Sequence, residues 1–165
     1  TMAFLDKYPE FIEAFSLFNS VPFADNEVKK AQRDITIEEI KRGKRVEICK
    51  SHVPKTFAKE NIEKFVKEIG FAKIIALNTP EKGVIAAIEG MKARKNYDEL
   101  LKNVDVPFIY FIGKKDNFIP YSTLKHIIMP KNHTIITLEN SGHQGYIEEC
   151  KKSVTTFKHF LTKIN

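Results

Sequence analysis

The sequence predicts an α/β fold with about three parallel strands, flanking helices and a helical insertion. A continuous apolar run at 106–112 (VPFIYFI) is typical of a parallel strand that is covered on both faces. A β-branched run at 134–138 (TIITL) predicts a second strand. Helical patterns precede, separate and follow these runs, and such alternation of strand and helix indicates a parallel α/β unit.

Residues 1–22 predict one helix and one strand of the sheet domain. Met2 and Leu5 recur at helical spacing, and Pro9 then discourages further helix. The apolar stretch that follows predicts a buried strand over Ala14–Phe18.

Residues 23–91 are rich in charge and predict four or five short helices. Apolar residues from Val28 to Ile40 recur at the spacing of a helix pair or of one bent helix. A later apolar stripe ends at Gly70, a suitable helix stop. Thr79-Pro80 predicts an N-cap followed by proline at the first position of another helix.

Residues 92–165 predict the rest of the sheet domain. Ser122–Ile128 is expected to form a short helix between the two late strands. From Ile147 onward, apolar residues recur at alternating spacings of three and four, which predicts one amphipathic helix packed on a sheet. Its stripe comprises Cys150, Val154, Phe157, Leu161 and Ile164.

Composition excludes several classes of protein. A chain of 165 residues with 42% hydrophobic and 29% charged residues has the size of one globular domain and is not expected to be disordered. No apolar run approaches the roughly 20 residues that cross a bilayer, and no secretory signal is visible, so no membrane partner is expected. Two cysteines, Cys49 and Cys150, are too few for a disulfide framework and favour a cytoplasmic location.

The net charge of +6 raises a nucleic-acid hypothesis, which the charge pattern disfavours. The densest basic cluster comprises Lys41, Arg42, Lys44 and Arg45. Glutamates flank it closely, and mixed Lys and Glu are typical of a solvated surface. No nucleic-acid partner is therefore expected.

No cofactor or metal is expected either. The sequence contains no Walker loop and no dinucleotide fingerprint. Four histidines lack metal-ligand spacing with Cys or another His, and they are His52, His126, His133 and His159.

Two residues that can carry chemistry follow the two late strands. Asp116 comes after the first strand and His143 after the second, and the carboxyl ends of parallel strands form the usual site of an open sheet. A carboxylate bonded to one ring nitrogen would orient the imidazole as a base, and Gly142 would let the backbone bend towards it. Taken singly, an aspartate after a strand is usually a turn former, and a histidine is usually a surface residue. Their equivalent positions favour the paired interpretation.

The motifs around these residues resemble a known family. The segments VPFIYFIGKKDNFIP (106–120) and MPKNHTIITLENSGHQGYIEE (129–149) resemble the C-terminal portion of α/β-hydrolase-fold enzymes. The resemblance implies that Asp116 and His143 are the last two members of a nucleophile–acid–histidine triad. It also implies that Thr1–Pro9 is the helix after the nucleophile turn and that 23–91 is a cap over the active site.

The sequence departs from the family at the nucleophile. It contains no Gly-x-Ser-x-Gly turn, and none of its serines has the flanking glycines; they are Ser16, Ser20, Ser51, Ser122, Ser141 and Ser153. The resemblance therefore implies a C-terminal fragment that lacks nucleophile and oxyanion hole and is inactive alone. The parent enzyme would hydrolyse a small acyl substrate, a carboxylic ester by default, with thioesters, amides and C–C bonds next to a carbonyl open.

Three further expectations concern binding. Apolar residues of the cap are candidates for an acyl pocket or merely pack its helices together: Phe57, Phe65, Ile69, Phe71 and Met91. An unpaired edge on the first strand predicts self-association, for example as a dimer. The competing function is a non-catalytic binding or regulatory module derived from the hydrolase fold.

Overall fold

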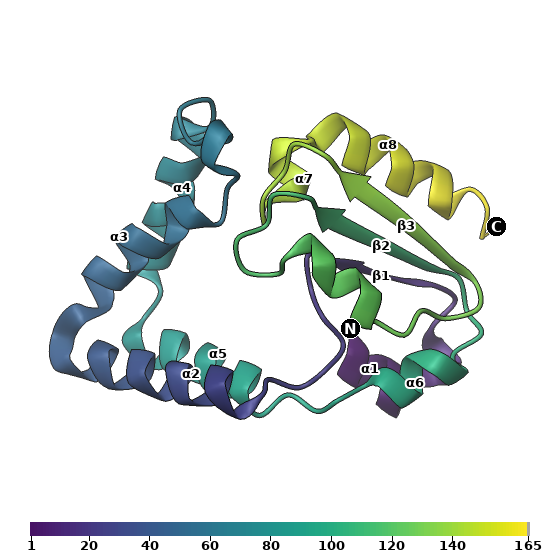
Figure 1. The fold of residues 1–165 in the computed structure, drawn as a ribbon, viewed down its shortest axis with the longest axis horizontal. Helices are drawn as coiled ribbons and strands as arrows, with labels where there is room; N and C mark the ends of the chain where they lie inside the picture. The colour runs from purple at the N-terminus through teal and green to yellow at the C-terminus, as the bar shows by residue number, and fades with distance from the viewer. Residues whose placement is uncertain (165) are drawn as a thin grey trace.

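The structure is a computed structural model that describes residues 1–164. Within this range, three parallel strands form one sheet in the order β1-β2-β3 (Figure 1). They are β1 (Phe15–Phe18), β2 (Phe108–Gly113) and β3 (His133–Leu138). The register places Phe15 opposite Phe108, and Phe108 opposite His133. All three predicted strands are confirmed to within about two residues at each end, as is the predicted α/β class.

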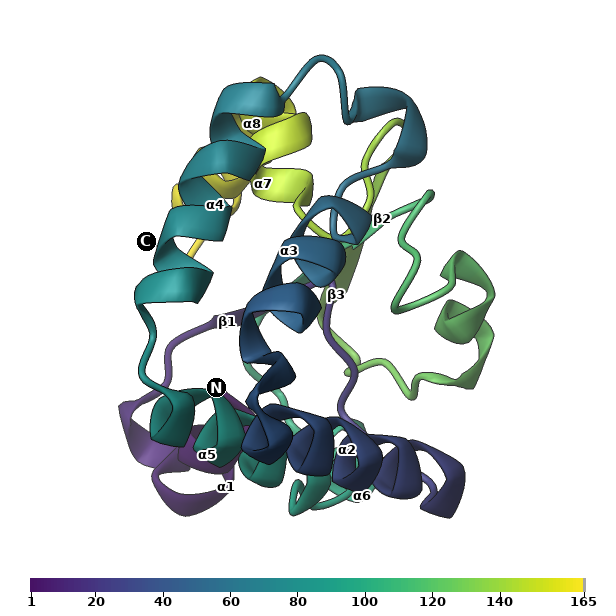
Figure 2. The same cartoon turned by 90° about the vertical axis from the view of Figure 1, so that its left-hand side faces the viewer.

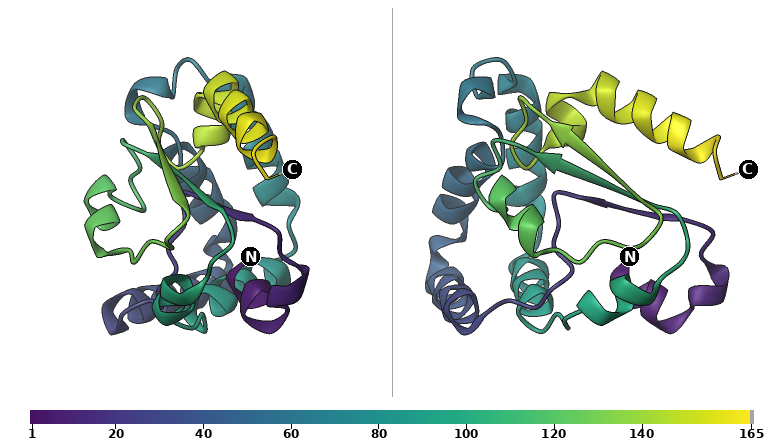
Figure 3. Two further views of the ribbon diagram at one scale, coloured as in Figure 1. Left: turned by 90° about the vertical axis from the view of Figure 1, so that its right-hand side faces the viewer. Right: turned by 45° about the vertical axis from the view of Figure 1, so that its right-hand side comes forward.

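Helices cover both faces of the sheet, as the turned views in Figure 3 show. Helices α1 (Met2–Lys7) and α6 (Asp98–Asn103) pack on one face, where Leu5 and Leu101 meet Phe15 and Tyr110. Helix α8 (Cys150–Leu161) covers the other face. All six residues of β2 are buried, which explains why this strand is a continuous apolar run.

Four helices form the insertion between β1 and β2, and we call them the helical insertion. They are α2 (Glu27–Glu39), α3 (Arg45–Lys55), α4 (Val66–Asn78) and α5 (Glu81–Lys92). Helix α2 packs on α5, and α3 on α4, so that the insertion forms an arm beside the sheet (Figures 1 and 2). Short turns lie at Pro9–Phe11, Ile40–Lys44 and Lys59–Asn61.

The apolar residues from Val28 to Ile40 predicted a helix pair or one bent helix, and the structure has two helices that meet at a kink at Gly43. The φ of Gly43 is +87°, a left-handed conformation that glycine adopts readily. A small core joins the helices there, built from Ile37, Ile40 and Ile88.

Two predicted helix boundaries in the insertion are wrong. Gly70 does not stop a helix but lies inside α4, which runs on to Asn78 because its second half packs against α3. Thr79 is not an N-cap: its hydroxyl donates to Ile75 O at 2.9 Å and closes the end of α4. The N-cap of α5 is Pro80, one residue later than predicted.

Two predictions in the C-terminal region also need correction. The expected helix over Ser122–Ile128 is a 3-10 turn, Tyr121–His126, because the segment is short and a proline follows it. The terminal helix is split at Glu149 into α7 (Gly145–Glu148) and α8. Phe157 packs on the sheet as predicted, whereas Val154 and Leu161 are exposed.

The basic cluster of the insertion is largely engaged in local pairs. Lys41 pairs with Glu38 at 2.8 Å, and Lys44 pairs with Glu39 at 3.2 Å. Arg45 donates to backbone carbonyls at the end of α4. In the part of the chain that the structure describes, no helix is both long enough and apolar enough to cross a membrane.

Candidate active site

Asp116 and His143 meet at the carboxyl edge of the sheet. Since Gly113 of β2 lies opposite Leu138 of β3, the loops that follow these strands leave the sheet side by side. His143 Nδ1 lies 2.8 Å from Asp116 Oδ2. The predicted contact between the two residues is therefore present.

The carboxylate of Asp116 is fixed on both oxygens. Its Oδ1 accepts hydrogen bonds from the backbone N–H groups of Phe118 at 2.7 Å and Ile119 at 3.1 Å. Its side chain is wholly buried, whereas that of His143 is 33% exposed. An ionised carboxylate can only accept, so the pairing with an ionised Asp116 requires a hydrogen on Nδ1, and a neutral imidazole in that tautomer has a lone pair on Nε2. Among residues 1–164, no hydrogen bond joins Nε2 to another group.

Asn19 ties the two loops together from the end of β1. Its side-chain oxygen accepts from Gly113 N at 2.8 Å, and its amide donates to Gly142 O at 2.7 Å. The residue is buried and has a φ of +39°, a left-handed conformation that asparagine tolerates better than most residues. The sequence did not predict this role of Asn19. The only signal for it is that an asparagine directly follows a predicted strand.

Comparisons with known proteins identify the fold. No family model matches the sequence, and no curated protein matches it. Among solved structures, an esterase from Thermogutta terrifontis has a TM-score of 0.91 at 20% identity over 99% of this chain. An enol-lactonase from Burkholderia xenovorans has a TM-score of 0.84 at 15% identity over 98% of this chain. An alpha/beta hydrolase from a deep-sea metagenome library has a TM-score of 0.80 at 18% identity, also over 98% of this chain.

The chain has the fold of the C-terminal part of an α/β hydrolase. It spans 60% of the length of each of these three proteins. The predicted fold is therefore confirmed, including its restriction to part of the larger hydrolase fold.

Two aromatic rings connect His143 to the helical insertion. Phe118 meets the His143 ring edge-on at a centroid distance of 5.6 Å, and the His52 ring of α3 lies 4.7 Å from Phe118. Burial lowers the pKa of His52 below its ordinary value, and the charges of Lys55 and His143 act in the same direction. Sequence reasoning had set His52 aside for want of metal-ligand spacing, and it offered no signal for this contact.

Tyr110 lies in β2 beneath the Asp116–His143 pair. Its hydroxyl donates to Ser20 O at 2.7 Å. Burial, together with the nearby charge of Asp116, raises the pKa of this phenol well above its ordinary value. Tyr110 therefore stays neutral and serves as a fixed part of the core beneath the acid.

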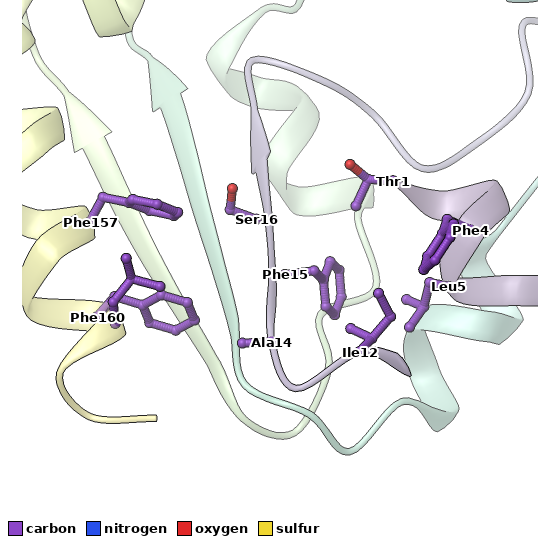
Figure 4. A pocket seen from close by; sticks show the side chains of 10 residues that line it. Thr1, Phe4, Leu5, Ile12, Ala14, Phe15, Ser16, Phe157 and Phe160 are labelled. Carbon is purple, nitrogen blue, oxygen red and sulfur yellow. The ribbon is translucent and has the colours of Figure 1, made fainter. Parts of the chain in front are cut away.

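An apolar groove of about 460 Å³ lies away from these residues (Figure 4). It is lined by α1, the start of β1 and α8, including Phe4, Phe15 and Phe160. The start of β1 is at the amino end of the sheet, opposite to Asp116 and His143. Among residues 1–164, no group of three or more His, Cys, Asp or Glu side chains could hold a metal ion.

The five apolar residues suggested for an acyl pocket lie in different surroundings. Phe57 and Ile69 are buried, and the Phe57 ring packs 6.1 Å from that of Phe65. Phe71 and Met91 are exposed. A role in substrate binding stays a prediction for each of them.

Proposed function

We propose that this chain supplies the acid and the general base of a serine α/β hydrolase, with Asp116 and His143 in these roles. The observation that carries the proposal is the 2.8 Å contact between Nδ1 and a buried, doubly anchored carboxylate. This arrangement fixes the tautomer in which Nε2 can accept a proton, and it stabilises the imidazolium that then forms.

The proposed reaction is acyl transfer to a serine and then to water. His143 Nε2 takes the proton of a serine hydroxyl as the hydroxyl attacks the carbonyl of the substrate. The imidazolium returns this proton to the leaving group, and the neutral ring then removes a proton from the water that releases the acid. Asp116 keeps its charge throughout and orients the ring.

The division of labour along the chain is part of the proposal. Residues 1–22 and 92–165 form the hydrolase core, and 23–91 form a cap that selects the substrate. The insertion approaches the site through His52 and Phe118, which supports this assignment. The similar structures include esterases and an enol-lactonase, which favours a carboxylic ester or lactone as substrate.

The serine itself and the oxyanion hole are proposed to lie in polypeptide that precedes Thr1. None of the six serines of this chain lies in a Gly-x-Ser-x-Gly turn, and none is hydrogen-bonded to His143 among the described residues. We therefore expect the pure chain to hydrolyse p-nitrophenyl acetate no faster than a buffer blank. Robust turnover that His143→Ala abolishes would contradict this expectation.

A non-catalytic binding or regulatory module is the second candidate function. It is favoured by the same lack of a serine turn, because the sheet and the insertion are well packed without one. The coding sequence upstream of Thr1 separates the two candidates. A continuous frame with a Gly-x-Ser-x-Gly turn a few codons earlier supports the hydrolase, whereas a start codon immediately upstream supports the module.

Self-association is proposed for the chain on its own. β1 pairs only with β2 among the described residues, so its other edge presents free N–H and C=O groups. The apolar groove lies beside this edge. We expect a second copy to cover both, and light scattering to report a dimer or larger species. A stable monomer at micromolar concentration would contradict this.

A further inference from the structure

Glu148 of α7 is a buried acid for which the proposed reaction has no use. Its exposed fraction is 7%, and no Lys, Arg or His among residues 1–164 pairs with it. Burying a carboxylate is costly unless hydrogen bonds replace its lost hydration. Its partners should therefore show what this residue does.

Both oxygens of Glu148 accept hydrogen bonds, and the donors come from two separate parts of the fold. Oε1 accepts from Gly142 N at 2.8 Å, in the residue that precedes His143. Oε2 accepts from Ala58 N at 2.8 Å and from the Asn61 side chain at 2.7 Å. One carboxylate thus joins the helical insertion to the histidine loop.

The same two segments also bond directly. Thr56 O accepts from His143 N at 2.7 Å and from Gln144 N at 3.2 Å. Asn61 donates to Asn140 O at 2.7 Å. We call the contact between residues 56–61 and residues 140–144, with Glu148 between them, the clasp.

Close packing leaves the clasp little freedom to slide. A Cβ atom on Gly142 would lie 2.5 Å from Ala58 N and 2.7 Å from Phe57 C, so the two backbones are in contact. Three consecutive N–H groups, those of residues 142–144, all point to acceptors in the clasp. The backbone of His143 is consequently fixed from the side of the insertion, and its ring is fixed by Asp116.

We propose that Glu148 is a positioning residue for His143: through the clasp, it holds the histidine backbone where the ring meets Asp116. This inference rests on the proposed function for its importance to catalysis, but the positioning itself can be measured without activity. In this proposal, the helical insertion positions His143 as well as covering the substrate.

A matched pair of substitutions tests the proposal. Glu148→Gln puts an NH₂ group where a carboxylate oxygen accepts, so it must lose one side of the clasp. Glu149→Gln is the control, because Glu149 accepts on Oε2 alone, from Asn140 N at 2.9 Å and Ser141 Oγ at 2.7 Å. A glutamine carbonyl can take over that position, and the charge change is the same.

The readout is NMR of the full chain labelled with ¹⁵N. We expect Glu148→Gln to broaden or remove the His143 Nδ1–H signal. We also expect exchange of either the Gly142 or the Ala58 amide, whichever faces the new NH₂ group, to speed up by about 10- to 100-fold, as expected for the loss of a charged hydrogen bond. Glu149→Gln should leave both as in the wild type. If Glu148→Gln does not fold, Asn61→Ala removes only the insertion's side-chain donor and should still speed exchange at Ala58.

Two results would overturn the proposal. One is a wild-type His143 signal in a folded Glu148→Gln variant, and the other is an equal loss in both variants, which would mean that charge alone matters. Asp116→Asn separates this outcome from a failure of the proposed function. If Asp116→Asn leaves the Nδ1–H signal unchanged, the Asp116–His143 pair itself is absent in solution.

Discussion

Two of the contacts between the helical insertion and the sheet domain are held by different chemistry. At the first, which we call the hinge, Asp25 pairs with Arg33 and Arg94, and Tyr97 N donates to Pro22 O at 3.0 Å. At the second, the clasp, backbone N–H groups and an asparagine surround one carboxylate. The hinge depends on paired charges, and the clasp depends on hydrogen bonds and close backbone packing.

The two attachments also differ in how completely their polar groups are used. At the hinge, the buried Arg94 Nε has no hydrogen-bond partner among residues 1–164. At the clasp, both oxygens of Glu148 are bonded. The better satisfied attachment is the one beside His143, which indicates that the position of the insertion is defined most tightly next to the proposed base.

The largest effect is expected from Gly142→Ala in the clasp. The new methyl group would collide with backbone atoms of Phe57 and Ala58, which cannot move aside as a flexible side chain can. We expect the free energy of unfolding to fall by about 3 kcal/mol in urea denaturation. Gly90→Ala in α5 is the control, because no heavy atom lies within 4 Å of the position that its new methyl group would take; it should be neutral or stabilising by about 0.5 kcal/mol. Equal stability of the two variants would show that the clasp is not close-packed.

The hinge should respond to acid. Burial opposes ionisation of Asp25, but the hydrogen bond and charge of Arg33 and the charge of Arg94 outweigh it and lower the pKa of Asp25. Its ionised form therefore stabilises the fold fully above the ordinary value near 3.8, and this contribution is lost as the pH falls towards the lowered value.

Asp25→Asn tests that assignment. It should cost about 2 kcal/mol at pH 7, since it leaves two partly buried arginines without their partner. It should also flatten the loss of stability between about pH 5 and about pH 2 that denaturant titrations of the wild type are expected to show. The amides of the clasp should exchange as in the wild type. If the dependence of stability on pH does not change in Asp25→Asn, a group other than Asp25 causes the loss of stability in acid.

The smallest effect is expected within the insertion, at Gly43. Its φ of +87° strains any other residue, although the surrounding space is open. Gly43→Ala should therefore cost about 1 kcal/mol of unfolding free energy, as a purely torsional penalty. Thermal denaturation measures this loss of stability. A loss as large as that of Gly142→Ala would contradict the expectation that backbone strain alone costs less than a collision with backbone atoms.

Features that depend on local pattern could be predicted from the sequence. The strand β2 is buried on both faces, so its run of apolar residues is continuous and its ends are clear. Asp116 and His143 follow neighbouring strands, and parallel topology brings such positions together. Gly70 misled the helix prediction, because the packing of α4 on α3 outweighs the small local cost of one glycine.

Features that depend on distant contacts could not be predicted. No local pattern marks Glu148 as buried, because its partners Ala58 and Asn61 lie about 90 residues away in the sequence. Gly142 was expected to allow a bend, yet its φ is not in the left-handed region, and the residue is needed for the close approach of Ala58. Asn19 likewise acts through contacts that no local pattern reveals.

The proposed function requires that His143 and Asp116 serve a nucleophile supplied by preceding polypeptide. The most direct test expresses this chain joined to the polypeptide encoded upstream of Thr1 and measures hydrolysis of p-nitrophenyl acetate. We predict turnover by the extended protein and a loss in kcat of at least about 1,000-fold in both His143→Ala and Asp116→Ala. Full activity in the extended His143→Ala variant would show that His143 is not the general base.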